Sequence, residues 1–160
     1  MPASKSFRDF LEEKAREGNE VTRRQQRQEW VDAVNRLVSQ LSQWLTEADP
    51  KGVLEVERVE FRKAEEEIGS YQVPGLDIRL GGTAGVRIMP VGRNVVGSVA
   101  FRGAVGMPAE GRVDLTDGFR KYTLYRTLEG GERWHVVDDR YNIAPLDQAR
   151  FEAIMQDLLS

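Results

Sequence analysis

One stretch of the sequence constrains the fold more than any other: a run of apolar residues at spacings of three and four. At about 100° per residue these side chains share an arc of roughly 140°, with polar residues on the other side. The eight positions are Trp30, Val31, Val34, Leu37, Val38, Leu41, Trp44 and Leu45. They predict a helix over residues 19–48 with one buried face, ended by Pro50 and Gly52.

The residues ahead of this helix predict a short amphipathic arm over residues 1–18. Ser6 is suited to cap the start of a separate short helix, since an aspartate follows three positions later. Three apolar side chains share one side of it: Phe7, Phe10 and Leu11. Gly18 and Asn19 predict a break before the long helix. The polar residues 22–29 indicate a solvated helix face, with a protein contact as the alternative.

From residue 52 the apolar period changes to two, which predicts antiparallel strands over residues 52–139. The apolar phase slips near Arg58, which indicates a bulge in the first strand. A last amphipathic helix follows over residues 145–159. We therefore expect one α+β domain, with a twisted antiparallel sheet of five to seven strands and both long helices on one face. A curl of the sheet toward a barrel is an alternative form.

The clearest part of the sheet is a three-stranded meander. The Asp-Gly pair at 117–118 suits a two-residue turn, which would set Asp114 opposite Lys121 and Val113 opposite Tyr122. A two-residue turn at 130–131 would oppose two glutamates, so we expect this second loop to be longer or twisted. The meander is predicted to be apolar on both faces. It would then be covered by a second layer, by a partner, or by closure of the sheet.

Composition limits the chemistry. The 160 residues contain no cysteine and a single histidine, His135, so disulfides and thiolate sites are excluded and a triad or zinc site depends on that one residue. Asp138 and Asp139 follow it closely, but alternation puts His135 and Asp138 on opposite faces of a strand. We expect no metal and no cofactor. A net charge of −3 gives no general attraction to nucleic acid.

The stretch from Gly92 to Val99, GRNVVGSV, resembles a phosphate-binding loop in its glycine spacing. A Walker A loop needs lysine and then Ser or Thr after its second glycine, followed by a helix. Here Ser98 and Val99 occupy those positions, and strand-like residues follow. The stretch is instead typical of a hairpin turn at Gly92, Arg93 and Asn94 between two strands.

No targeting signal or apolar run of membrane-spanning length occurs in the sequence, which predicts a cytoplasmic protein that does not bind membranes. Missing catalytic residue types favour a non-catalytic interaction module, such as an adaptor, a chaperone-like protein or an immunity-type protein. Its partner would be another protein or a second copy. The expected contact residues are Phe7, Phe10, Leu11, Phe119, Tyr125 and Trp134. The alternative is an enzyme or a small-ligand or anion binder that uses arginine and aspartate groups in a sheet cleft, with Arg87, Arg93 and Arg102 as anion ligands.

Overall fold

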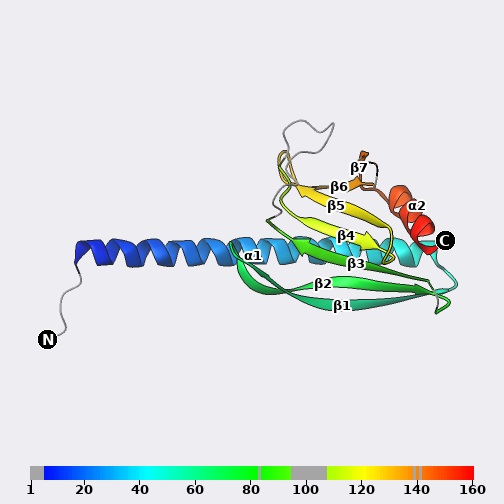
Figure 1. The fold of residues 1–160 in the computed structure, drawn as a ribbon, viewed down its shortest axis with the longest axis horizontal. Coiled ribbons are helices and arrows are strands. Elements are labelled where there is room, and N and C mark those ends of the chain that lie inside the picture. Colours follow the sequence, from blue (N-terminus) through cyan, green and yellow to red (C-terminus); the bar gives the residue numbers. More distant parts are fainter. Residues whose placement is uncertain (1–5, 83, 95–107, 139, 141) are drawn as a thin grey trace.

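The computed structural model describes residues 6–82, 84–94, 108–138, 140 and 142–160. Two helices lie together on one face of a seven-stranded antiparallel sheet built from these residues, and the sheet is not closed. The α+β prediction is thus confirmed, and the barrel alternative is wrong for this part of the chain. Helix α1 runs along the sheet and continues far beyond it toward the N-terminus (Figure 1).

The sheet is a simple meander in which each strand pairs with the next one along the chain. Its seven strands are β1 (Leu54–Glu65), β2 (Gly69–Leu80), β3 (Ala84–Gly92), β4 (Arg112–Thr116), β5 (Lys121–Thr127), β6 (Arg133–Val137) and β7 (Ile143–Pro145). The strand predicted after the turn at residues 92–94 lies outside the described residues. Local pairing of this kind needs no long crossover connections.

Helix α1 is one continuous helix, Phe7–Ala48, of 42 residues. The predicted break at Gly18 and Asn19, and with it the separate arm of residues 1–18, is wrong. A glycine within a helix costs only about 1 kcal/mol, and the glutamate, lysine and arginine residues around it are good helix formers. The Gly18 carbonyl also accepts a hydrogen bond from the Thr22 hydroxyl at 3.0 Å.

Strand β1 pairs with β2 without interruption, from Leu54 opposite Leu80 to Glu65 opposite Gly69. The bulge predicted near Arg58 is therefore wrong, and a register shift occurs instead in β3, between Pro90 and Gly92. The apolar phase changes because apolar residues occupy both faces of one regular strand. Phe61 packs over Gly75 of β2, where a Cβ atom would overlap its ring.

The turn between β4 and β5 has four residues, since Thr116 pairs with Lys121. Asp114 consequently lies opposite Thr123 and not Lys121, so the two-residue turn was a wrong prediction. The Asp117 carboxylate closes the longer turn by accepting the backbone N–H groups of residues 119 and 120, at 2.8 and 2.6 Å. The loop between β5 and β6 is also long, as predicted, with Thr127 opposite Arg133.

This register places most apolar side chains of the meander on one face. Leu124 lies opposite both Val113 and Val136, and Trp134 shares their face opposite Arg126. The other face carries mainly polar residues together with Tyr125 and Val137; its polar members include Asp114, Thr123, Thr127 and His135. The prediction of a sheet that is apolar on both faces is therefore wrong. The error lies at the β5–β6 loop, whose five residues set Trp134 opposite Arg126 and Val136 opposite Leu124, and so place both on the core side.

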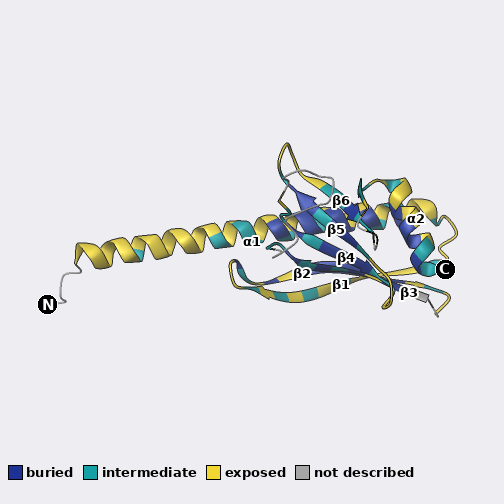
Figure 2. Cartoon of the chain, turned by 45° about the horizontal axis from the view of Figure 1, so that its top comes forward, coloured by how far each residue is buried: buried dark blue, intermediate teal, exposed yellow. Residues whose placement is uncertain are grey.

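The core lies between the sheet and the C-terminal half of α1, joined by α2 (Gln148–Leu159). Burial in α1 begins abruptly at Trp30, and the helix ahead of it is exposed along most of its surface (Figure 2). Seven residues of α1 are buried: Trp30, Ala33, Val34, Leu37, Val38, Leu41 and Leu45. Helix α2 begins three residues later than predicted, because Pro145 belongs to β7 and Asp147 caps the helix by accepting the Arg150 N–H at 2.7 Å.

Candidate functional site

Trp30 marks the point at which α1 leaves the sheet. It is fully buried, and its indole N–H donates to the Tyr71 hydroxyl at 3.2 Å. Its ring lies 6.1 Å from that of Trp134, centroid to centroid. Gly111 approaches so closely that a Cβ atom there would overlap the indole. Contacts from β2, β6 and the residue that precedes β4 thus fix one turn of the long helix.

We call these contacts around Trp30 the anchor, and a buried arginine adds charge to them. Arg126 is 2% exposed and contacts carboxylates of Glu29 on α1 at 3.0 Å and of Glu132 at 2.8 Å. Its guanidinium also lies 6.0 Å from the centre of the Trp30 ring. Burial would raise the pKa of Glu132, but hydrogen bonds from Arg126 and Arg36 outweigh it and lower that pKa. Ion pairs therefore connect residues that are 96 or more positions apart in the sequence.

Glu65 and Tyr71 complete the anchor beside the end of β3. The Glu65 carboxylate accepts the backbone N–H groups of Arg93 at 3.1 Å and Asn94 at 2.9 Å, and it accepts the Tyr71 hydroxyl. Burial, followed by the nearby Glu65 carboxylate, raises the pKa of Tyr71. The phenol therefore stays protonated near neutral pH and acts here as a hydrogen-bond donor. It is not poised to act as a base.

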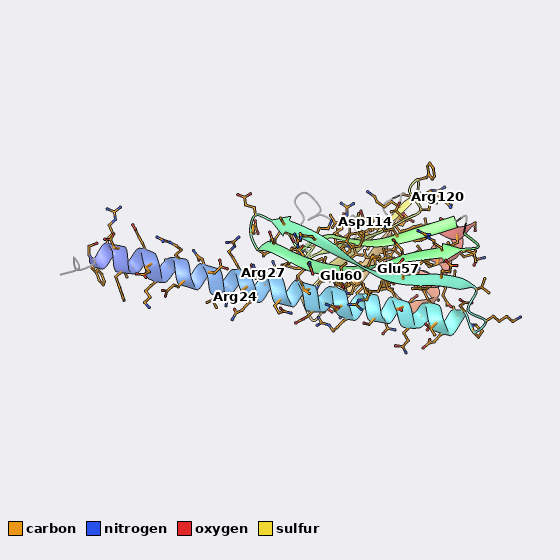
Figure 3. The ribbon with its side chains drawn as sticks, turned by 90° about the horizontal axis from the view of Figure 1, so that it is seen from below. Arg24, Arg27, Glu57, Glu60, Asp114 and Arg120 are labelled. Atoms are coloured by element: carbon orange, nitrogen blue, oxygen red, sulfur yellow. The ribbon has the colours of Figure 1, made fainter. Side chains whose placement is uncertain are left out.

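Two arginines extend the same contact by two turns toward the N-terminus. Arg23 donates to the backbone carbonyls of Glu66 and Glu67 at 3.3 and 3.1 Å, and Arg27 donates to that of Ile68 at 2.8 Å. Figure 3 shows Arg27 beside the end of the β1–β2 hairpin. Part of the polar segment that we predicted to be a solvated helix face thus holds the hairpin turn.

The segment of α1 ahead of Arg23, residues 7–22, is here called the arm. Sixteen residues of helix span about 24 Å. Ser6 caps its start by accepting the Asp9 N–H at 3.1 Å, as predicted. Phe7 is 75% exposed, Phe10 46%, Leu11 49% and Val21 50%. The Phe7 and Phe10 rings stack with centroids 6.4 Å apart. Within the described residues of α1, every exposed large apolar side chain therefore lies in the arm.

The exposed apolar residues of the arm share one side of the helix. At about 100° per residue, Phe7, Phe10, Leu11 and Val21 fall within an arc of roughly 100°. The centre of this arc lies roughly 170° around the helix from the buried stripe that begins at Trp30. We call these four residues the apolar strip. It faces away from the sheet, so the arm cannot fold its apolar side onto its own domain while α1 stays continuous.

The six predicted contact residues do not form one surface. Phe119 is 98% exposed, but it lies in the β4–β5 turn, whose Arg120 reaches the C-terminal helix at Asp157. Figure 3 shows Arg120 at the opposite end of the sheet from Arg27. Tyr125 is half-buried on the outer face of β5, whereas Trp134 packs against the core beneath Trp30. Only the three residues of the arm lie together.

The predicted anion ligands are not brought together as free cations. Arg87 donates two hydrogen bonds to the Asp77 carboxylate, at 2.8 and 3.1 Å. Arg93 lies 3.5 Å from the Glu110 carboxylate and next to Glu65. Within the described residues its Nε finds no hydrogen-bond acceptor, but the two carboxylates beside it would repel an anion. Arg102 lies outside the described residues.

His135 contacts the Thr127 hydroxyl through Nε2 at 2.9 Å, and burial lowers its pKa. Asp138 instead accepts backbone N–H groups of the following turn, from Arg140 and Asn142. Asp139 is outside the described residues. Across the described part of the chain, no three acidic or histidine side chains gather closely enough to hold a metal ion.

Comparison with models of known protein families, with curated proteins and with solved structures finds no match to this chain. No helix in the described ranges combines the length and apolar character needed to cross a bilayer.

One residue of the apolar strip, Val21, was not among the predicted contact residues. The sequence nevertheless carries a signal for it. Val21 is an isolated apolar residue in a polar stretch, and its helical angle matches that of Phe7, Phe10 and Leu11. That match becomes visible only when the helix is taken as continuous through Gly18.

Proposed function

We propose that this protein is a non-catalytic interaction module whose docking element is the arm. The observation that carries the proposal is the apolar strip: four side chains 46–75% exposed, on the side of α1 that faces away from its own sheet. Three large apolar side chains on a helix at spacings of three and four are typical of a helix that binds in an apolar groove.

The anchor around Trp30 supports the proposal because it makes the arm a continuation of the rigid domain. A partner would then meet a helix that is already formed and oriented. Ordering a flexible segment on binding costs about 0.5–1.5 kcal/mol for each immobilised side chain, and a preformed helix avoids part of that cost.

The size of the strip indicates a transient contact. Full burial of a large apolar side chain contributes about 1.5–3 kcal/mol, and these side chains are about half exposed at the start. Four of them would supply about 3–6 kcal/mol before the cost of association. A micromolar complex needs about 8 kcal/mol net, so further contacts would be required for tight binding. Whether the module acts as an adaptor, a chaperone-like protein or an immunity-type protein remains a prediction, as does a cytoplasmic location.

The test uses two matched double variants of the full chain. Phe10→Ser with Leu11→Ser removes the centre of the strip. Glu12→Ser with Arg16→Ser changes the opposite side of the same turns, keeps the net charge, and introduces the same two serines. We expect both variants to melt within about 2 °C of wild type, because neither touches the core. We also expect the strip variant alone to lose self-association in light scattering, or the cross-linked partners that wild type captures from lysate.

Equal binding by all three proteins would contradict the proposal. A large loss of stability in the strip variant would also contradict it, because the strip would then belong to the core.

A further inference from the structure

The charges beside the apolar strip allow the partner to be specified more closely, on the assumption that the arm is the docking element. The arm contains five acidic and three basic residues. At about 100° per residue, Glu13, Glu17 and Glu20 line one flank of the strip, roughly 65–125° from its centre. The other flank carries a single charge, at Arg8, and is otherwise formed by small or uncharged residues: Ala15, Asn19 and Thr22.

From this asymmetry we infer that the arm docks on a basic partner: an amphipathic protein segment whose apolar face is edged by lysine or arginine. The Glu17 and Glu20 side chains are 59% and 49% exposed, and each contacts a cation of its own helix at 3.4 Å. Such exposed pairs contribute little to stability, so a partner's cations can replace or join them at small cost. An apolar face with a basic edge would match both the strip and its acidic flank.

A second copy of this chain fits the same surface poorly. A two-fold antiparallel pair of arms brings like flanks together, so the glutamates of one arm would face those of the other. In a parallel pair Lys14, whose helical angle falls inside the arc of the apolar strip, would face Lys14 of the second copy. Like charges placed directly opposite each other are unfavourable. The acidic flank equally disfavours an anionic lipid surface.

The test uses two synthetic amphipathic peptides of equal length and equal leucine content. One has lysine and the other glutamate at its polar positions. Binding to the full-length protein is followed by fluorescence anisotropy at low and high ionic strength. We expect the leucine–lysine peptide to bind, with an affinity that falls as salt is added, and the leucine–glutamate peptide not to bind.

Two triple variants with the same change in net charge locate the effect. The first carries Glu13→Gln, Glu17→Gln and Glu20→Gln. The second carries Glu55→Gln, Glu57→Gln and Glu60→Gln on β1, where Figure 3 shows Glu57 and Glu60 on the sheet and away from the arm. The arm variant should weaken binding of the leucine–lysine peptide about tenfold, and the β1 variant less than about twofold.

Equal weakening by both triple variants, or equal binding of both peptides, would overturn the basic-partner inference. Self-association that depends on Phe10 and Leu11 but not on the three glutamates would also overturn it, in favour of a second copy, while the proposed function would stand. If substitution of Phe10 and Leu11 alters neither peptide binding nor self-association, the inference and the proposed function both fail.

Discussion

The two halves of α1 form one unbroken helix but are stabilised in different ways. From Trp30 to Leu45 the helix buries seven side chains against the sheet and α2. From Phe7 to Thr22 its described polar side-chain contacts lie within the helix itself, and include Arg8 with Glu12 and Lys14 with Glu17. Pairs of this kind contribute about 0.2–0.5 kcal/mol each, whereas one buried large side chain contributes about 1.5–3 kcal/mol.

Within this single helix, the half that stabilises the domain differs from the half that exposes apolar residues. The C-terminal half of α1 forms part of the core, because its apolar stripe is buried only when it packs against the sheet and α2. The N-terminal half has no such requirement, so its apolar residues are free to serve another surface. Trp30, Arg126 and the arginine contacts to the β1–β2 turn form the boundary between the two.

The largest expected effect lies on the core side of that boundary. Trp30→Ala should destabilise the protein by about 3–5 kcal/mol, because it leaves a large cavity among Trp134, Gly111 and Tyr71. In a chain of this length that corresponds to a fall of about 10 °C or more in Tm, measured by thermal melting.

Val21→Ala is the matched control, since it shortens an apolar side chain of the same helix nine residues away, at a position that is 50% exposed. It should change the free energy of unfolding by less than about 0.5 kcal/mol. Similar melting of the two variants would remove the distinction between the two halves.

A smaller effect is expected at the glycine within the arm. A Cβ atom at Gly18 would meet nothing within 4 Å, so Gly18→Ala introduces no clash. It should stabilise the arm locally by about 1 kcal/mol, since alanine is the better helix former. Amide exchange of residues 7–22 should slow by about fivefold, with Tm changed by less than about 2 °C. An equal slowing of exchange across the core would indicate that the arm unfolds together with the domain.

Much of the fold was predictable from local patterns. The stripe from Trp30 to Leu45 fixed the buried face of α1, and alternation with turn residues identified an antiparallel sheet. The errors arose where a local rule competed with a larger effect. Gly18 suggested a break, but its cost is small beside the helix propensity of its neighbours. An Asp-Gly pair suggested a two-residue turn, but Asp117 binds backbone groups of a longer one.

The candidate site was predictable only in part. Phe7, Phe10 and Leu11 share a spacing that any helical projection reveals. Their direction relative to the sheet could not be deduced, because it requires knowing that the helix continues unbroken to Trp30. The anchor joins Glu29 to Arg126 across 97 positions, and no local pattern links residues so far apart. Tyr125 and Trp134 were predicted to be contact residues together, but they lie on opposite faces because the five-residue β5–β6 loop sets Tyr125 opposite His135 and Trp134 opposite Arg126.

The most direct test of the division of α1 is the melting temperature of a chain that lacks residues 1–17. This deletion removes three of the four residues of the apolar strip and retains Arg23, Arg27 and the anchor around Trp30. We predict that Tm stays within about 2 °C of the full-length value, because the deleted helix makes no contribution to the core. A fall of about 5 °C or more would show that the arm helps to hold the domain together, and would contradict the claim that α1 divides into a structural half and a docking half.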